Sequence, residues 1–73
     1  MVERLRARFG FTKTEAEVAV ALVDGLSYGE VAKKLGISYH TVHTHIKAIH
    51  HKAAVSTTGR LSALIRGALD VQS

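Results

Sequence analysis

The chain has 73 residues, 47% of them hydrophobic and 22% charged, with a formal net charge of +4. This composition is typical of a folded domain and excludes a disordered chain, and the short length leaves few residues for enclosing a substrate cleft. There is no cysteine and no proline, which excludes disulfides, thiolate metal sites and a cysteine nucleophile and favours helices over strands. We therefore expect residues 1–73 to form a single helical domain.

The first strong helix signal is a capping box formed by Thr12 and Glu15. In this motif each residue's side chain accepts a hydrogen bond from the backbone amide of the other. An apolar stripe follows and Gly25 supplies a left-handed end, which predicts a helix from Lys13 to Asp24. Before it, the apolar residues Val2, Leu5 and Phe9 have the spacing of a further amphipathic turn over residues 2–9.

The apolar surface of this predicted helix is wider than one stripe, because Ala16 and Val20 extend it. One explanation is that the N-terminal residues pack on its second side. The alternative is that this side docks an upstream domain or another subunit. The sequence leaves both open.

A second capping box, formed by Ser27 and Glu30, begins a short helix from Tyr28 to Leu35 that ends at Gly36. Its buried side is expected to consist of Val31, Ala32 and Leu35.

Ser38 then caps a third helix, predicted from Tyr39 to about Lys52. The connection between the two helices is only Gly36-Ile37-Ser38, which forces a steep crossing of the helix-turn-helix kind. The apolar residues Val42, Ile46 and Ile49 have the spacing of a single buried stripe. The opposite side is polar and partly cationic.

A fourth helix is predicted from Ser56 or Thr57 to about Leu69. The expected fold class is therefore all-α, with four helices that contain a helix-turn-helix and an additional N-terminal helical turn.

Positive charge is concentrated in the second half of the chain. No carboxylate occurs between Glu30 and Asp70, whereas this stretch contains Lys33, Lys34, Lys47, Lys52, Arg60 and Arg66. A polyanion, either nucleic acid or an anionic membrane, is the expected partner, although a merely basic surface would have the same charge. No stretch approaches the ~20 apolar residues of a membrane span. The start lacks the apolar core of a secretory signal, so we expect a cytoplasmic protein.

Four segments of the sequence resemble the LuxR (GerE-type) DNA-binding domain of bacterial transcription regulators. They are Thr12-Lys13-Thr14-Glu15-Ala16-Glu17-Val18, Gly25-Leu26-Ser27, Glu30-Val31-Ala32-Lys33-Lys34-Leu35-Gly36-Ile37-Ser38 and Thr41-Val42-His43-Thr44-His45. The resemblance runs from about Phe11 to Leu69. It implies a helical, winged-helix-like DNA-binding fold whose third helix enters the major groove and whose fourth helix forms a dimer on a two-fold DNA site.

The resemblance also implies a role for individual residues. The positions that face base edges are His43, Thr44 and Lys47. The positions that contact the DNA backbone are Ser27, Tyr28, Tyr39, Thr41, His45, Ser56 and Thr57. The positions that form the dimer are Leu61, Leu64, Ile65 and Ala68. The implied partners are double-stranded DNA, a second copy of the chain, an upstream receiver or ligand-binding domain and RNA polymerase.

The chain departs from the family pattern in three places. His43 and Gly29 stand where the family commonly has a lysine or arginine, so two fixed positive charges are missing from the expected DNA side. After the third helix the family usually has Lys-Leu-Gly-Val, whereas this chain has Lys52-Ala53-Ala54-Val55. Because Ala54 stands where the family has glycine, the sequence lacks the residue that usually ends a helix in the left-handed conformation.

Three alternative functions are weighed against DNA binding. A metal site is not expected, because the histidines of the third helix, among them His40 and His43, have no cysteine or nearby carboxylate to complete a set of four ligands. Neither a cofactor nor an enzyme is expected, since no nucleophile or acid–base pair is present in a cleft. A helical protein-interaction module of the same fold stays open because of the missing charges. The promoter-binding helical domain of sigma factors shares the first three helices, but the fourth helix favours the LuxR type.

Overall fold

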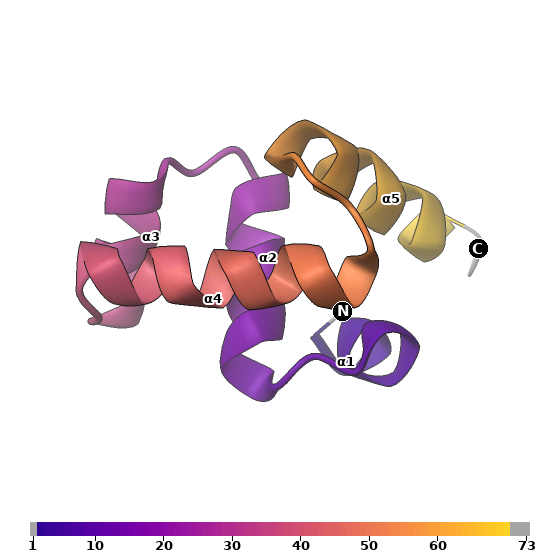
Figure 1. Ribbon diagram of the computed structural model, residues 1–73, viewed down its shortest axis with the longest axis horizontal. Coiled ribbons are helices and arrows are strands. Elements are labelled where there is room, and N and C mark those ends of the chain that lie inside the picture. The colour runs from indigo at the N-terminus through magenta and orange to yellow at the C-terminus, as the bar shows by residue number, and fades with distance from the viewer. Residues whose placement is uncertain (1, 71–73) are drawn as a thin grey trace.

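The computed structural model describes the backbone of residues 2–70 and the side chains of residues 2–67. Within this range the chain forms five α-helices and no strand (Figure 1). The helices are α1 (Val2–Phe9), α2 (Lys13–Val23), α3 (Tyr28–Leu35), α4 (Tyr39–Ala53) and α5 (Thr58–Asp70). The predicted all-α fold is confirmed. None of the helices in residues 2–70 has the length and apolar character to cross a membrane.

Both predicted capping boxes are present. At the start of α2 the Thr12 hydroxyl accepts a hydrogen bond from the Glu15 amide at 3.1 Å, and the Thr12 amide donates to the Glu15 carboxylate at 2.9 Å. At the start of α3 the Ser27 hydroxyl and the Glu30 carboxylate form the same pair of bonds, at 3.2 and 2.7 Å. The Ser38 hydroxyl accepts from the Thr41 amide at 3.0 Å, as expected of a cap on α4.

Three helices end with a left-handed residue, which directly follows the last helical residue in α3 and α4 and comes after the right-handed cap Asp24 in α2. Gly25 and Gly36 adopt positive φ after α2 and α3, and the next residue donates its amide back to the helix. At the end of α4 this position is occupied by Ala54, with φ 57° and ψ 41°. The amide of Val55 donates to the His50 carbonyl at 3.0 Å, which completes the Schellman arrangement. The helix ends after Ala53 although no glycine is present.

The N-terminal segment forms a complete helix, so the prediction of a single turn was too short. Leu5 of α1 is 1% exposed and belongs to the core, and Phe9 stacks on Phe11 with 5.1 Å between ring centroids. Ala16 of α2 is fully buried and Val20 is partly buried against the same core. Packing within the chain therefore accounts for most of the second apolar side of α2, which leaves little of it for docking.

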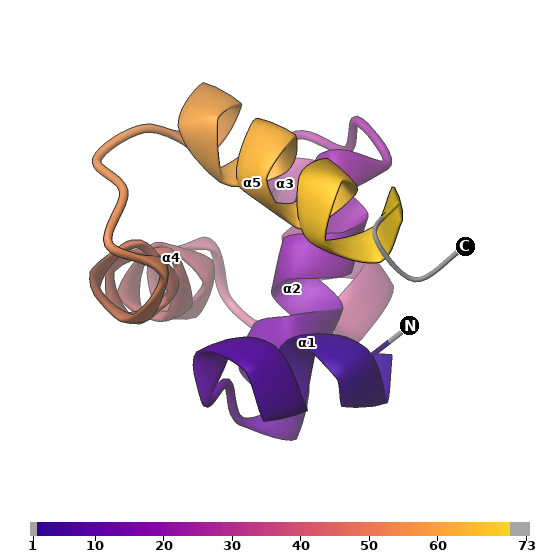
Figure 2. The ribbon, with the colours of Figure 1, turned by 90° about the vertical axis from the view of Figure 1, so that its right-hand side faces the viewer.

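The arrangement of the helices leaves one long side of α4 uncovered. In Figure 1 α4 lies across α2, with α3 next to its first half and α1 and α5 near its second half. Figure 2 shows α4 nearly end-on at one edge of the molecule, with no other helix beyond it. The apolar residues of α4 face inward, where Val42, Ile46, Ile49 and Ala53 are buried. Its opposite side therefore faces solvent along the length of the helix.

Candidate nucleic-acid interface

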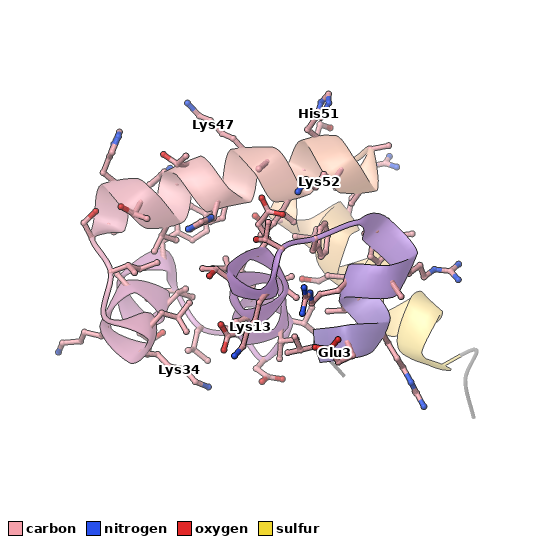
Figure 3. All side chains as sticks on the ribbon, turned by 90° about the horizontal axis from the view of Figure 1, so that it is seen from below. Glu3, Lys13, Lys34, Lys47, His51 and Lys52 are labelled. Carbon is pink, nitrogen blue, oxygen red and sulfur yellow. The ribbon has the colours of Figure 1, made fainter. Side chains whose placement is uncertain are left out.

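The uncovered side of α4 is polar and carries a positive charge. Thr44 and Lys47 are exposed on it, and Figure 3 shows Lys47 and His51 projecting away from the rest of the molecule. The Thr44 hydroxyl donates to the His40 carbonyl one turn earlier, at 3.3 Å. An exposed polar helix face that follows a steep helix-turn-helix connection has the geometry to enter a major groove.

An aromatic cluster lies at the start of this side, formed by Tyr28 of α3 and by Tyr39 and His43 of α4. The imidazole of His43 lies nearly perpendicular to the Tyr28 ring, at 83° with 5.0 Å between centroids, and 4.8 Å from the Tyr39 ring. His43 and Tyr28 are half-buried, whereas Tyr39 is 56% exposed. Of the three side chains that the sequence assigns to base edges, His43 is thus the one held by neighbouring rings.

The starts of α3 and α5 are brought together by one hydrogen bond. The Tyr28 hydroxyl and the Thr58 hydroxyl lie 3.1 Å apart, and either can be the donor. Thr57 caps α5, because its hydroxyl accepts from the Arg60 amide at 3.1 Å, and Ser27 caps α3. Ser27, Ser56 and Thr57 are exposed. Two helix N-termini, whose free amides attract anions, therefore lie on the same side of α4.

Lys52 holds α4 to the start of α2 through a partly buried ion pair. Its ammonium lies 2.6 Å from the carboxylate of Glu15, whose side chain is only 8% exposed. Burial by itself raises the pKa of Glu15, but the hydrogen bonds from Lys52 and from the Thr12 amide act in the other direction. Together with the charges of Lys52 and His45 they lower the pKa below its ordinary value of 4.5. His45, which is half-buried on α4, makes the smallest of these contributions.

The basic stretch found in the sequence does not form one continuous patch. Lys52 is paired with Glu15, and Arg66 of α5 donates to the Val23 carbonyl at the end of α2, at 3.2 Å. Figure 3 shows Lys34 on the side of the molecule away from Lys47. The cation that is exposed on the uncovered side of α4 is therefore Lys47.

The family comparison supports the interpretation of this geometry. The profile of the family described as bacterial regulatory proteins, luxR family, matches residues 10–62, well over half of the 73-residue chain. The chain belongs to the LuxR family. It thus carries a LuxR-type helix-turn-helix DNA-binding domain, and the family consists of transcription regulators rather than enzymes. Comparison with curated proteins and with solved structures gives no significant match.

The LuxR-family match covers the site but not all of the structure. It includes α2, α3, α4 and the beginning of α5, and it excludes α1, which nevertheless supplies Leu5 to the core. The predicted DNA-contacting residues all lie within the matched part.

The residues that the resemblance assigns to a LuxR-type dimer lie in different environments. Leu61 and Ile65 are fully buried in the core of the single chain, so their side chains are not available to a second copy in this fold. Leu64 is partly buried and packs against the core. The side chain of Ala68 lies outside the described residues. A dimer through α5 therefore has to use the remaining surface of that helix.

The histidines of this LuxR-type domain do not gather into one site. Within the described residues no three histidine or carboxylate side chains are arranged to hold a metal ion. His40 and His51 are exposed, whereas His43, His45 and His50 are half-buried. The Nε2 atom of His50 is buried and has no hydrogen-bond partner among the described residues.

Two contacts of the site have no signal in the sequence. Thr58, which bonds Tyr28, and Glu15, which bonds Lys52, are 30 and 37 residues away from their partners. Both contacts depend on how the helices pack.

Proposed function

We propose that this chain binds double-stranded DNA in a sequence-specific manner, with α4 in the major groove. The observation that carries the proposal is the uncovered side of α4, where Thr44 and Lys47 are exposed. Lys47 would donate to guanine O6 or N7, and a well-formed contact of this kind is worth roughly 1–3 kcal/mol of discrimination. Thr44 and His43 would contact neighbouring base edges.

The DNA backbone would lie on both sides of α4. On one side, the N-termini of α3 and α5 offer hydroxyls and free amides to phosphates. The residues at these two N-termini are Ser27, Tyr28, Ser56 and Thr57. Tyr39, Thr41 and His45 would contact phosphates next to the groove. Membership of the LuxR family supports further parts of the proposal. A second copy would bind through the free surface of α5, so that the dimer occupies a two-fold DNA site. The other partners would be an upstream receiver or ligand-binding domain and RNA polymerase, and the location would be the cytoplasm, on the nucleoid.

The proposal is tested by selection from a random-sequence duplex library, followed by affinity measurements at several salt concentrations. Lys47→Ala is compared with Lys34→Ala, which removes the same charge from an exposed residue on the other side of the molecule. We expect the unmodified chain to enrich a two-fold motif, Lys47→Ala to lose part of it, and Lys34→Ala to keep it. Enrichment of no motif, with weak binding that hardly depends on salt, would contradict the proposal. Because Gly29 and His43 supply no fixed charge, that result would favour a protein-interaction module.

A further inference from the structure

We propose that Tyr28 is a positioning residue that sets where His43 lies in the DNA groove and connects it to the phosphate contact at the start of α5. The inference rests on the proposed DNA-binding function and assigns to Tyr28 a role beyond direct backbone contact. Tyr28 is suited to it because its ring and its hydroxyl contact different helices, α4 through His43 and α5 through Thr58.

The ring of Tyr28 restricts the imidazole of His43 from the α3 side. The two rings lie nearly perpendicular, with 5.0 Å between centroids, which is a favourable aromatic arrangement. Tyr39 contacts the same imidazole from its own helix, at 4.8 Å, but it is 56% exposed. The half-buried Tyr28 ring therefore restricts the His43 imidazole more than the exposed Tyr39 ring does, and it limits the orientations from which His43 can donate to a base.

The hydroxyl of Tyr28 contacts the start of α5, where the second group of proposed phosphate contacts lies. It lies 3.1 Å from the Thr58 hydroxyl, in the first turn of α5 next to the Thr57 cap. A hydroxyl donates one hydrogen bond and accepts others. When the Thr58 hydroxyl donates its hydrogen to a phosphate, its oxygen accepts a hydrogen bond from the Tyr28 hydroxyl. Hydrogen bonds in such a chain strengthen one another. Phosphate contact at α5 and the orientation of His43 are thus linked through one side chain.

The two halves of this role are separated by two substitutions. Tyr28→Phe keeps the ring against His43 and removes the bond to Thr58, whereas Tyr28→Leu removes both. Lys34→Ala is the control, because Lys34 is exposed on the side of the molecule away from Lys47 and is assigned to no DNA contact. Thermal unfolding of each variant establishes that it is folded before DNA is added.

The first measurement is selection from a random-sequence duplex library, with His43→Ala and Lys47→Ala alongside. We expect Tyr28→Leu to lose preference at the motif position that His43→Ala also loses, and to keep the position that depends on Lys47. Tyr28→Phe should keep the whole motif and weaken binding to every sequence by between about twofold and tenfold, the usual cost of one hydrogen bond. Lys34→Ala should keep the whole motif. An even loss of affinity in Tyr28→Leu, with the His43 position intact, would overturn the proposal.

The second measurement is independent of DNA binding. The tyrosine rings shift the side-chain NMR signals of His43, and we expect Tyr28→Leu to move these signals and Tyr28→Phe to leave them nearly in place. Unmoved signals in Tyr28→Leu would overturn the positioning role even where DNA is bound. If the unmodified chain enriches no motif, the proposed function fails and the base-directed part of this inference fails with it. The NMR result then shows separately whether Tyr28 contacts His43.

Discussion

Replacing Ala54 with glycine is expected to stabilise the chain, because Ala54 ends α4 in a conformation that glycine adopts without strain. At φ 57° and ψ 41° it is the single non-glycine residue with positive φ among residues 2–70. A side chain in this region costs roughly 1–2 kcal/mol, since Cβ approaches the following carbonyl oxygen. The greater freedom of glycine in the unfolded chain offsets roughly 0.4–1 kcal/mol of that gain. Ala54 is exposed, so little packing is lost.

The expected net gain from Ala54→Gly is about 1 kcal/mol, which corresponds to a rise in Tm of about 4–8 °C for a domain of this size. Thermal unfolding followed by circular dichroism measures it. Ala63→Gly is the matched control, because Ala63 is exposed in the interior of α5, where the same change should cost about 1 kcal/mol.

The reverse change at the end of α3 provides a second comparison. Gly36 has φ 67°, and a Cβ added there would meet no atom within 4 Å, so Gly36→Ala should lower Tm by conformational strain alone. The reasoning is refuted if Ala54→Gly lowers Tm or leaves it unchanged while the two other variants behave as expected.

Two further predictions concern stability and pH. Because the folded-state pKa of Glu15 is lowered, its pair with Lys52 should stabilise the fold fully above pH 4.5 and be lost as the pH falls through the lower folded value. Urea unfolding between about pH 6 and 3 should therefore show less loss of stability in Glu15→Gln than in the unmodified chain, and equal slopes would contradict this. Leu61→Ala should cost about 2–5 kcal/mol of unfolding free energy at any protein concentration, since Leu61 is buried within one chain; a loss that appears only at high concentration would instead indicate a dimer contact.

The helix boundaries could be predicted because they depend on neighbouring residues. Ser27 with Glu30 and Ser38 with Thr41 satisfy amides three positions away, and the bonds in the structure are the predicted ones. The residue that ends α3, Gly36, is a similarly local signal. The end of α4 carries no such signal, since Ala54 adopts a conformation that its residue type does not favour.

What could not be predicted depends on packing between distant segments. A helix of eight residues is marginal on its own, and α1 forms because Leu5 is buried against the rest of the core. The apolar side of α5 has the same periodicity whether it packs inside one chain or between two copies. The sequence therefore did not distinguish a core role for Leu61 and Ile65 from a dimer role. Lys52 likewise counted among the cations that indicated a polyanion partner, and nothing in the sequence indicated that it pairs with Glu15.

The position of α1 affects how this DNA-binding domain can be combined with other proteins. The family match begins at residue 10, whereas the core includes Leu5, and Phe9 stacks on the buried Phe11. A fragment cut at the family boundary would expose apolar surface that α1 covers and would be prone to aggregate. A chimera that joins this domain to another sensory module therefore needs its junction before Val2, or a substitute for α1 from the new partner.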